Sequence, residues 1–151
     1  MSHPAFKRPE SVLVVVHTDA DVLVLERLKP KGFIQSVTGS LEDGESPAAC
    51  ARRELAEEIG LCRTDQLRDL GLEQRFPIAP DWRHRYAPAV KENLEYAFAL
   101  PVDDPFEPQL NPDEHVAHRW LSAEEAAAAV TSWTNRRAIR YIFRDGDEPS
   151  A

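Results

Sequence analysis

The segment GSLEDGESPAACARRELAEEIGL, residues 39–61, carries five glutamates and one aspartate in an otherwise helix-forming stretch. On an ideal helix, Glu54 and Glu58 lie about 40° apart and Glu57 lies about 60° to the other side of Glu54, so three carboxylates share one face. Like charges at this spacing cost stability, and neither Glu54 nor Glu57 has a basic residue four positions onward. Clustered oxygen ligands of this kind suit Mg²⁺, with Mn²⁺ as a substitute. A solvated acidic face is the alternative that charge alone leaves open.

A helix from Ala48 to Ile59 is predicted to carry these carboxylates. Ser46 is a suitable N-cap, Pro47 suits the first helical position, and Gly60 is placed to end the helix. Four apolar side chains form a stripe beside the acidic face: Ala48, Ala51, Leu55 and Ile59. We expect this stripe to pack on a sheet and to hold the acidic face still.

The complete spacing of this segment fits the 23-residue Nudix box. Gly39 is followed by five residues, Glu45, seven residues and then the run RELAEEIGL at 53–61. The chain therefore resembles the Nudix hydrolases, in which such a box binds divalent metal and activates water to cleave a nucleoside diphosphate linked to another group. The resemblance implies an α/β fold, a Nudix-type α/β/α sandwich with a mixed sheet. It also implies that residues 1–151 form a single Nudix hydrolase domain.

The resemblance assigns roles to the residues of the box. Glu54 and Glu58 correspond to metal-binding carboxylates, Glu57 to a third ligand or a base, and Gly39 to a carbonyl ligand. Arg53 and Glu45 would hold the loop and helix together by ion pairing.

Stretches outside the box resemble a narrower family, the bacterial dihydroneopterin triphosphate pyrophosphohydrolases of folate synthesis. They are FKRP (6–9), IQSVTGS (34–40), RHRYAP (83–88), EHVAHRWL (114–121) and SWTNRRAI (132–139). This resemblance implies hydrolysis of 7,8-dihydroneopterin triphosphate to the monophosphate and pyrophosphate. It implies substrate contacts from Lys7, Arg27, Thr38, Phe76, Pro77, Ile78, Ala79 and Ser132. Glu114 would add a metal ligand, and Glu57, Glu58 and Glu114 are the candidates for the base that accepts the proton of water.

Physical chemistry leaves alternatives open for several of these residues. Lys7 and Arg27 are suitable phosphate-binding cations, but ordinary surface charge explains them equally well. Phe76 and Ile78 offer an apolar platform for a flat ring, and packing in the core is the alternative. Trp133 is expected in the core.

Three neighbouring basic residues and two later histidines are left out of the predicted site. Arg83, His84 and Arg85 fit either a phosphate clamp or a solvated loop. His115 and His118 lack a third ligand at zinc-site spacing.

Two other functions compete with the pterin hydrolase. A broader nucleoside triphosphate pyrophosphohydrolase, for example one acting on dATP, would share the box and differ in how the ring is recognised. A non-catalytic Nudix module that senses a nucleotide-like ligand is the alternative from another class. Such modules usually have a degraded box or an appended domain, and this sequence shows neither.

Apolar runs predict the elements around the box. SVLVVVH (11–17) and VLVLERL (22–28) fit a hairpin or two adjacent strands, and further strands are expected in FIQSVTG (33–39), NLEYAFALP (93–101) and HVAHRWL (115–121). Residues 75–92, rich in Pro and Arg, fit a functional loop. Ser122 and Glu125 form a capping box for a helix over 123–130, and NRRAIRYIF (135–143) predicts a last helix.

The composition of the chain limits the kinds of partner that we expect the protein to bind. The net charge of −8 argues against nucleic acid, and the 42% hydrophobic content includes no apolar run near the roughly 20 residues of a membrane span. The N-terminus lacks an apolar signal core, and Cys50 and Cys62 form no CxxC pair. We therefore expect a cytoplasmic protein, a monomer or weak homodimer, whose partner is a small pterin or nucleoside triphosphate.

Overall fold

The computed structural model describes residues 6–144. Its strands are β1 (Glu10–His17), β2 (Asp21–Arg27), β3 (Ile34–Gln35), β4 (Val37–Ser40), β5 (Arg68–Pro77), β6 (Glu92–Pro101) and β7 (His115–Ser122). Its helices are α1 (Pro47–Ile59), α2 (Ala123–Ala129), α3 (Trp133–Ile142) and a short 3-10 helix, η1 (Pro80–Arg85). No helix of the described part is long and apolar enough to cross a membrane.

The seven strands form one mixed sheet. The main path runs β3-β2-β1-β6-β5, while β4 pairs with β1 and β7 pairs with β2. The β1–β6 pair is parallel, and the other pairs are antiparallel. Strand β1 has partners on both edges, because residue 11 lies opposite Ser40 of β4 and opposite Glu95 of β6.

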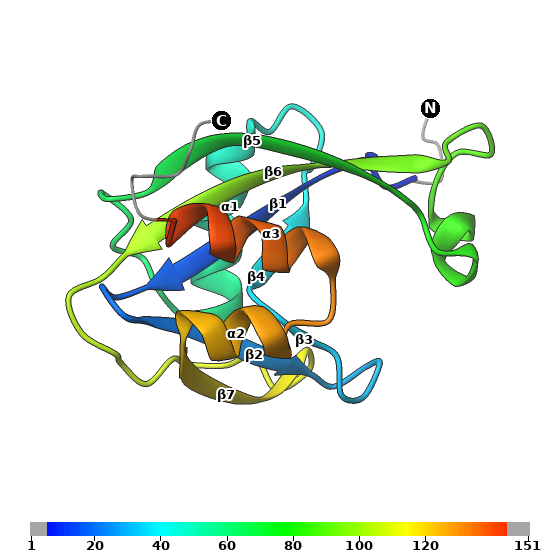
Figure 1. The fold of residues 1–151 in the computed structure, drawn as a ribbon. Coiled ribbons are helices and arrows are strands. Elements are labelled where there is room, and N and C mark those ends of the chain that lie inside the picture. Colours follow the sequence, from blue (N-terminus) through cyan, green and yellow to red (C-terminus); the bar gives the residue numbers. More distant parts are fainter. Residues whose placement is uncertain (1–5, 145–151) are drawn as a thin grey trace.

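Helices cover both faces of the sheet, with α1 on one face and α2 and α3 on the other (Figure 1). Alternate residues of β1 reach the two sides: Val12 and Val14 pack in the cluster that contains Leu55 of α1, and Leu13 and Val15 pack with Ile139 of α3. A strand buried on both faces reads as a continuous apolar run, as β1 does. The predicted α/β/α sandwich with a mixed sheet is confirmed.

Two elements differ from the sequence prediction. The expected strand over 33–39 is two short strands, β3 and β4, which pair with β2 and β1 respectively. Strand β5 was not predicted at all, and its last three residues lie in the expected loop. It is an edge strand in which Gln74 is the one buried residue, so it lacks the apolar alternation that marks a half-buried strand.

Candidate active site

The helix α1 begins and ends as its sequence predicts. The Ser46 hydroxyl accepts a hydrogen bond from the Ala49 N–H at 3.1 Å. Gly60 adopts a left-handed φ of 69° and its N–H donates to the Ala56 carbonyl at 3.1 Å. A left-handed C-terminal residue favours glycine, so both ends of the helix are fixed locally.

The three glutamates of α1 do not lie in equivalent surroundings. Glu54 and Glu58 belong to the face of α1 that is buried together with Leu55 and Ile59, and they are 8% and 2% exposed. The side chain of Glu57 is 54% exposed and pairs with Arg53 at 3.4 Å. The three carboxylates that were predicted to share one face beside the apolar stripe therefore differ in burial: Glu54 and Glu58 are buried and Glu57 is exposed.

Arg53 connects the helix to the preceding loop. Its Nε and Nη2 donate to the two oxygens of Glu45 at 2.8 and 2.9 Å, and Nη2 also donates to the Ser40 carbonyl at 3.0 Å. The bidentate hydrogen bonds from Arg53 lower the pKa of Glu45 to about 2. Arg53 Nη1 lies 3.0 Å from Glu54 Oε2, which orients that carboxylate.

Gly39 allows the loop to approach Glu54 closely. A Cβ atom at position 39 would lie 2.0 Å from Glu54 Oε2 and 2.1 Å from its carboxyl carbon. Only glycine therefore leaves room for the carboxylate in its observed place. The proposed role of the Gly39 carbonyl as a metal ligand stays a prediction.

Glu58 lies in a cluster of potential metal ligands. One ligand atom each of Glu58, Glu114 and His115 lie within 4.8 Å of one another. Glu58 Oε1 is buried and has no hydrogen-bond partner among the described residues. Burial, with Glu54 and Glu114 nearby, raises the pKa of Glu58 well above its usual value, and burial likewise raises the pKa of Glu54. A buried carboxylate oxygen without a partner, crowded by two further carboxylates, fits a hard divalent cation.

His115 is a member of this cluster that the sequence analysis did not assign. It is 3% exposed, and its Nε2 lies 3.2 Å from Gln35 Nε2 and 4.0 Å from Glu58 Oε1. Burial and the nearby Arg27 lower its pKa to about 4, so the ring is neutral at pH 7. Its position directly after Glu114 was the available signal, but the pairing of β7 with β2 is what brings it to the site.

A pocket of about 850 Å³ extends from these carboxylates across the sheet. Most of the predicted substrate-binding residues line it: Lys7, Arg27, Thr38, Phe76, Pro77, Ile78 and Ala79. Glu54, Glu58, Glu114 and Gly39 line it as well, whereas Glu57 is not among its described lining residues. The structure thus brings two distant parts of the predicted site, the box and residues 76–79, into one cavity.

The cationic side chains of Lys7 and Arg27 line the pocket. Burial and the nearby Arg85 and Arg27 lower the pKa of Lys7, so these basic groups are close enough to repel one another. The Arg27 guanidinium carbon lies 5.8 Å from the centre of the Trp82 ring. Thr38 donates its hydroxyl hydrogen to the Val12 carbonyl at 2.7 Å, which leaves its oxygen lone pairs as acceptors.

Ser132 lies outside this group. It is absent from the described lining of the pocket and instead caps α3, accepting from the Asn135 N–H at 3.1 Å. Its hydroxyl is also 3.1 Å from Thr134 Oγ1. Trp133, expected in the core, is 50% exposed.

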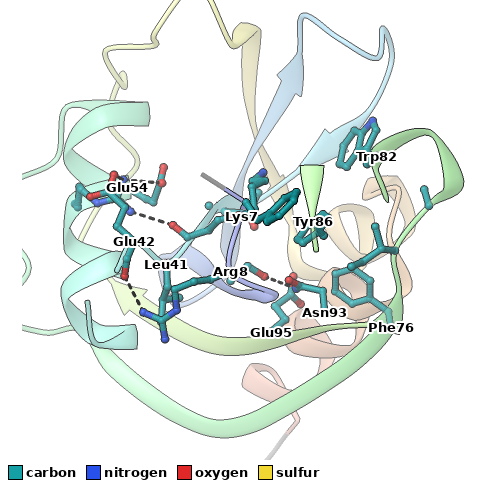
Figure 2. Close-up of a pocket in the computed structure, with 18 of the residues that line it drawn as sticks. Lys7, Arg8, Leu41, Glu42, Glu54, Phe76, Trp82, Tyr86, Asn93 and Glu95 are labelled. Atoms are coloured by element: carbon teal, nitrogen blue, oxygen red, sulfur yellow. Dashed lines mark hydrogen bonds and ion pairs between the residues drawn. The ribbon is translucent and has the colours of Figure 1, made fainter. Parts of the chain in front are cut away.

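The end of the pocket away from α1 contains polar residues that the sequence analysis did not assign. Figure 2 shows Asn93 and Glu95 beside Phe76, with Glu54 on the opposite side and Lys7 between them. Asn93 Nδ2 donates to Ser11 Oγ at 2.8 Å, and Gln74 Nε2 donates to Glu95 Oε1 at 3.3 Å. The available signal was the polar residues at alternate positions of an otherwise apolar strand, NLEYAFALP.

Comparison with known proteins identifies the family. The NUDIX domain family matches residues 7–142. The chain belongs to the Nudix hydrolases. It is 42% identical over 147 residues to the dihydroneopterin triphosphate diphosphatase of Escherichia coli K12, covering 94% of this chain and 97% of that protein. It is 38% identical over 144 residues to the Haemophilus influenzae protein of the same name, covering 91% and 90% of the two chains.

A solved Nudix structure agrees with the described fold. The E. coli dihydroneopterin triphosphate pyrophosphohydrolase superimposes with a TM-score of 0.82 at 39% identity, covering 91% of this chain and 96% of that one. The predicted membership in the Nudix hydrolases is therefore confirmed, and the resemblance to the narrower family extends over nearly the whole chain.

Proposed function

We propose that this Nudix hydrolase converts 7,8-dihydroneopterin triphosphate to dihydroneopterin monophosphate and pyrophosphate. The observation that carries the proposal is that one pocket has two different ends. One end is rich in carboxylates and is called the carboxylate end; the other has an aromatic wall and buried polar groups and is called the ring end. Glu54, Glu58 and Glu114 line one end, and Phe76 lies with Asn93 and Glu95 at the other. The full-length similarity to dihydroneopterin triphosphate diphosphatases supports the same substrate.

The carboxylate end would hold the divalent cation that Nudix hydrolases use. Glu54, Glu58 and Glu114 would be its carboxylate ligands, with the Gly39 carbonyl beside them, and Glu57 is the more exposed candidate on the same helix. We infer Mg²⁺ as the ion, with Mn²⁺ as a substitute, because the proposed ligands are carboxylate and carbonyl oxygens and the ring nitrogen of His115 is the one other donor that the described residues bring to the cluster. When bound, such an ion neutralises phosphate charge and lowers the pKa of the water bound to it.

Side chains of this pocket would position the triphosphate. Lys7 and Arg27 offset its negative charge in a chain whose net charge is −8. Thr38 would accept a hydrogen bond from a hydroxyl group of the substrate, because its own hydroxyl hydrogen is donated to Val12. Pro77 and Ala79 would frame the ring beside Phe76 and Ile78. Ser132 would act at the ring end through Thr134, since it does not itself line the pocket.

A carboxylate must accept the proton of the attacking water. Glu58 and Glu114 both line the pocket, whereas Glu57 is not among its described lining residues and pairs with Arg53. A base must reach the water within hydrogen-bond distance, so this arrangement favours Glu58 or Glu114 over Glu57.

A kinetic panel tests the proposed substrate. With saturating Mg²⁺, kcat/KM for 7,8-dihydroneopterin triphosphate should exceed the values for dATP, GTP and nucleotide sugars, and pyrophosphate should be the primary product. Pyrophosphate and orthophosphate must be assayed separately, because they report which phosphorus–oxygen bond is broken. A clear preference for dATP, or orthophosphate as the first product, would overturn the pterin assignment.

A further inference from the structure

Two buried polar residues at the ring end of the pocket keep acceptor atoms available. Asn93 and Glu95 are 4% and 5% exposed, and both line the pocket. They are two residues apart on β6, so their side chains point to the same side of the sheet. Figure 2 shows them next to each other near Phe76.

The hydrogen bonds within the protein do not use all of these acceptors. Asn93 gives its Nδ2 to Ser11, and its Oδ1 is buried without a hydrogen-bond partner among the described residues. Glu95 receives hydrogen bonds from Gln74, at 3.3 Å, and from Thr134, but a carboxylate has room for about four. Buried polar atoms in native proteins are nearly always paired, so an unpaired oxygen on a residue that lines a pocket points to a donor on a ligand.

An apolar surface lies directly beside these acceptors. Phe76 is opposite Asn93 in the β5–β6 ladder, and Ile78 continues the same wall of the pocket. A flat ring that stacks on an aromatic side chain places the polar groups of its edge to the side. The edge that fits here must present N–H donors, because both facing groups accept hydrogen bonds.

We propose that Glu95 and Asn93 recognise the edge of a fused ring that carries an amino group next to a ring N–H, as in a 2-amino-4-oxopteridine. The inference rests on the proposed function and names the residues that select its ring. The carboxylate of Glu95 would accept two parallel N–H bonds, and Asn93 Oδ1 would accept the second amino hydrogen. Guanine presents the same two donors. Adenine presents a ring nitrogen lone pair beside its amino group, which the carboxylate repels.

The surrounding groups hold Glu95 in place for this contact. Gln74 lies opposite Glu95 in the β5–β6 ladder and donates to both Glu95 Oε1 and the Thr134 carbonyl. Ser132 is hydrogen-bonded to Thr134, so the end of α3 supports the same carboxylate. Burial raises the pKa of Glu95 to about 7, partly offset by hydrogen bonds from Thr134 and Gln74, and N–H donors from a ring would favour its charged form.

The test compares the wild type with Glu95→Gln and with Glu92→Gln, a control at an exposed position of the same strand. kcat/KM is measured at saturating Mg²⁺ for dihydroneopterin triphosphate, GTP and dATP. Glu95→Gln should lower kcat/KM for dihydroneopterin triphosphate and GTP by about 10- to 100-fold, because one acceptor becomes a donor that faces the ring N–H. Its value for dATP should not fall below that of the wild type, because the substitution removes the repulsion between the carboxylate and the adenine lone pair. Retained activity on dATP also shows that the variant is folded and that its carboxylate end is intact.

A binding measurement separates ring recognition from catalysis. Dihydroneopterin without phosphates should bind at least about tenfold more weakly to Glu95→Gln than to the wild type and to Glu92→Gln, as measured by calorimetry. Equal losses for all three triphosphates, or an unchanged ranking of substrates, would overturn the inference. If the wild type fails to hydrolyse dihydroneopterin triphosphate, the proposed function fails separately. The change in the GTP to dATP ratio then still decides whether Glu95 selects the ring edge.

Discussion

Glu58 and Glu95 are both buried glutamates of one pocket, yet their neighbours are different. Glu58 lies against Glu54 and Glu114, so the group that stabilises its charge must be a cation. Glu95 receives hydrogen bonds from neutral groups, so N–H donors of a neutral ring suffice. Burial raises the pKa of both carboxyls. A buried carboxylate needs a partner to be charged, and its neighbours determine whether that partner is a metal ion or a hydrogen-bond donor.

The largest effect should come from Glu58→Gln. Turnover should fall at least ~10²-fold, the scale of removing one electrostatic contributor to catalysis. The helix should remain folded, because a neutral amide relieves repulsion from Glu54 and Glu114. Steady-state kinetics over a Mg²⁺ titration, with circular dichroism as the check on folding, measures both. Unchanged turnover at saturating Mg²⁺ in a folded variant would falsify the proposal that Glu58 is a ligand of the cation.

Gly39→Ala tests the carboxylate end a second time, without changing any charge. The new methyl group would occupy the space of the Glu54 carboxylate, which must move because it would lie 2.0 Å away. We expect the Mg²⁺ concentration for half-maximal activity to rise about 10- to 100-fold, as is typical when groups that orient metal ligands are lost.

A double-mutant cycle is the control for this effect. In a Glu54→Ala background, the alanine at position 39 has no carboxylate to displace, so Gly39→Ala should add little to the loss. If Gly39→Ala reduces metal activation equally in both backgrounds, its effect does not act through Glu54.

The smallest effect concerns Glu95 and the stability of the unliganded protein. Its folded-state pKa is about 7, above the ordinary 4.5, so its stabilising contribution is complete below pH 4.5 and is lost as the pH rises through 7. Glu95→Gln removes this titration. The free energy of unfolding of Glu95→Gln relative to the wild type should therefore increase by about 1 kcal/mol between pH 6 and pH 8. Denaturant unfolding at both pH values measures the difference, and Glu92→Gln should show none.

The carboxylate end was largely predictable from the sequence because its geometry is local. The N-cap Ser46, the left-handed Gly60 and the pair Arg53–Glu45 all lie within the box, and each acts over a few residues. What spacing could not give is the burial of Glu54 and Glu58, since the width of the packed face depends on the sheet beneath α1. The same limit applies to His115, which reaches Glu58 only through the pairing of β7 with β2.

The ring end was only half predictable. Phe76 was expected near the substrate by resemblance, and it lines the pocket; its contact with substrate stays a prediction. Asn93 and Glu95 could not be assigned, because the edge strand β5 lacks apolar alternation and its register with β6 was unknown. That register places Gln74 opposite Glu95 and Phe76 opposite Asn93. Side chains become a site here only through the pairing of β5 with β6.

The parallel pairing of β1 with β6 also has a consequence for how the molecule is made. Residues 10–17 pair with residues 94–101, more than half the chain length away, whereas β4 and α1 follow β1 closely in sequence. Closing so long a loop costs chain entropy, and contacts of large sequence separation slow folding, so we expect this pairing to limit the folding rate. During synthesis, β1 meets β4 and α1 long before β6 has left the ribosome. Glu54 and Glu58 can thus reach their places around β1 first, whereas Glu114, which follows β6 in the chain, joins the carboxylate end only after both strands of the ring end have been made.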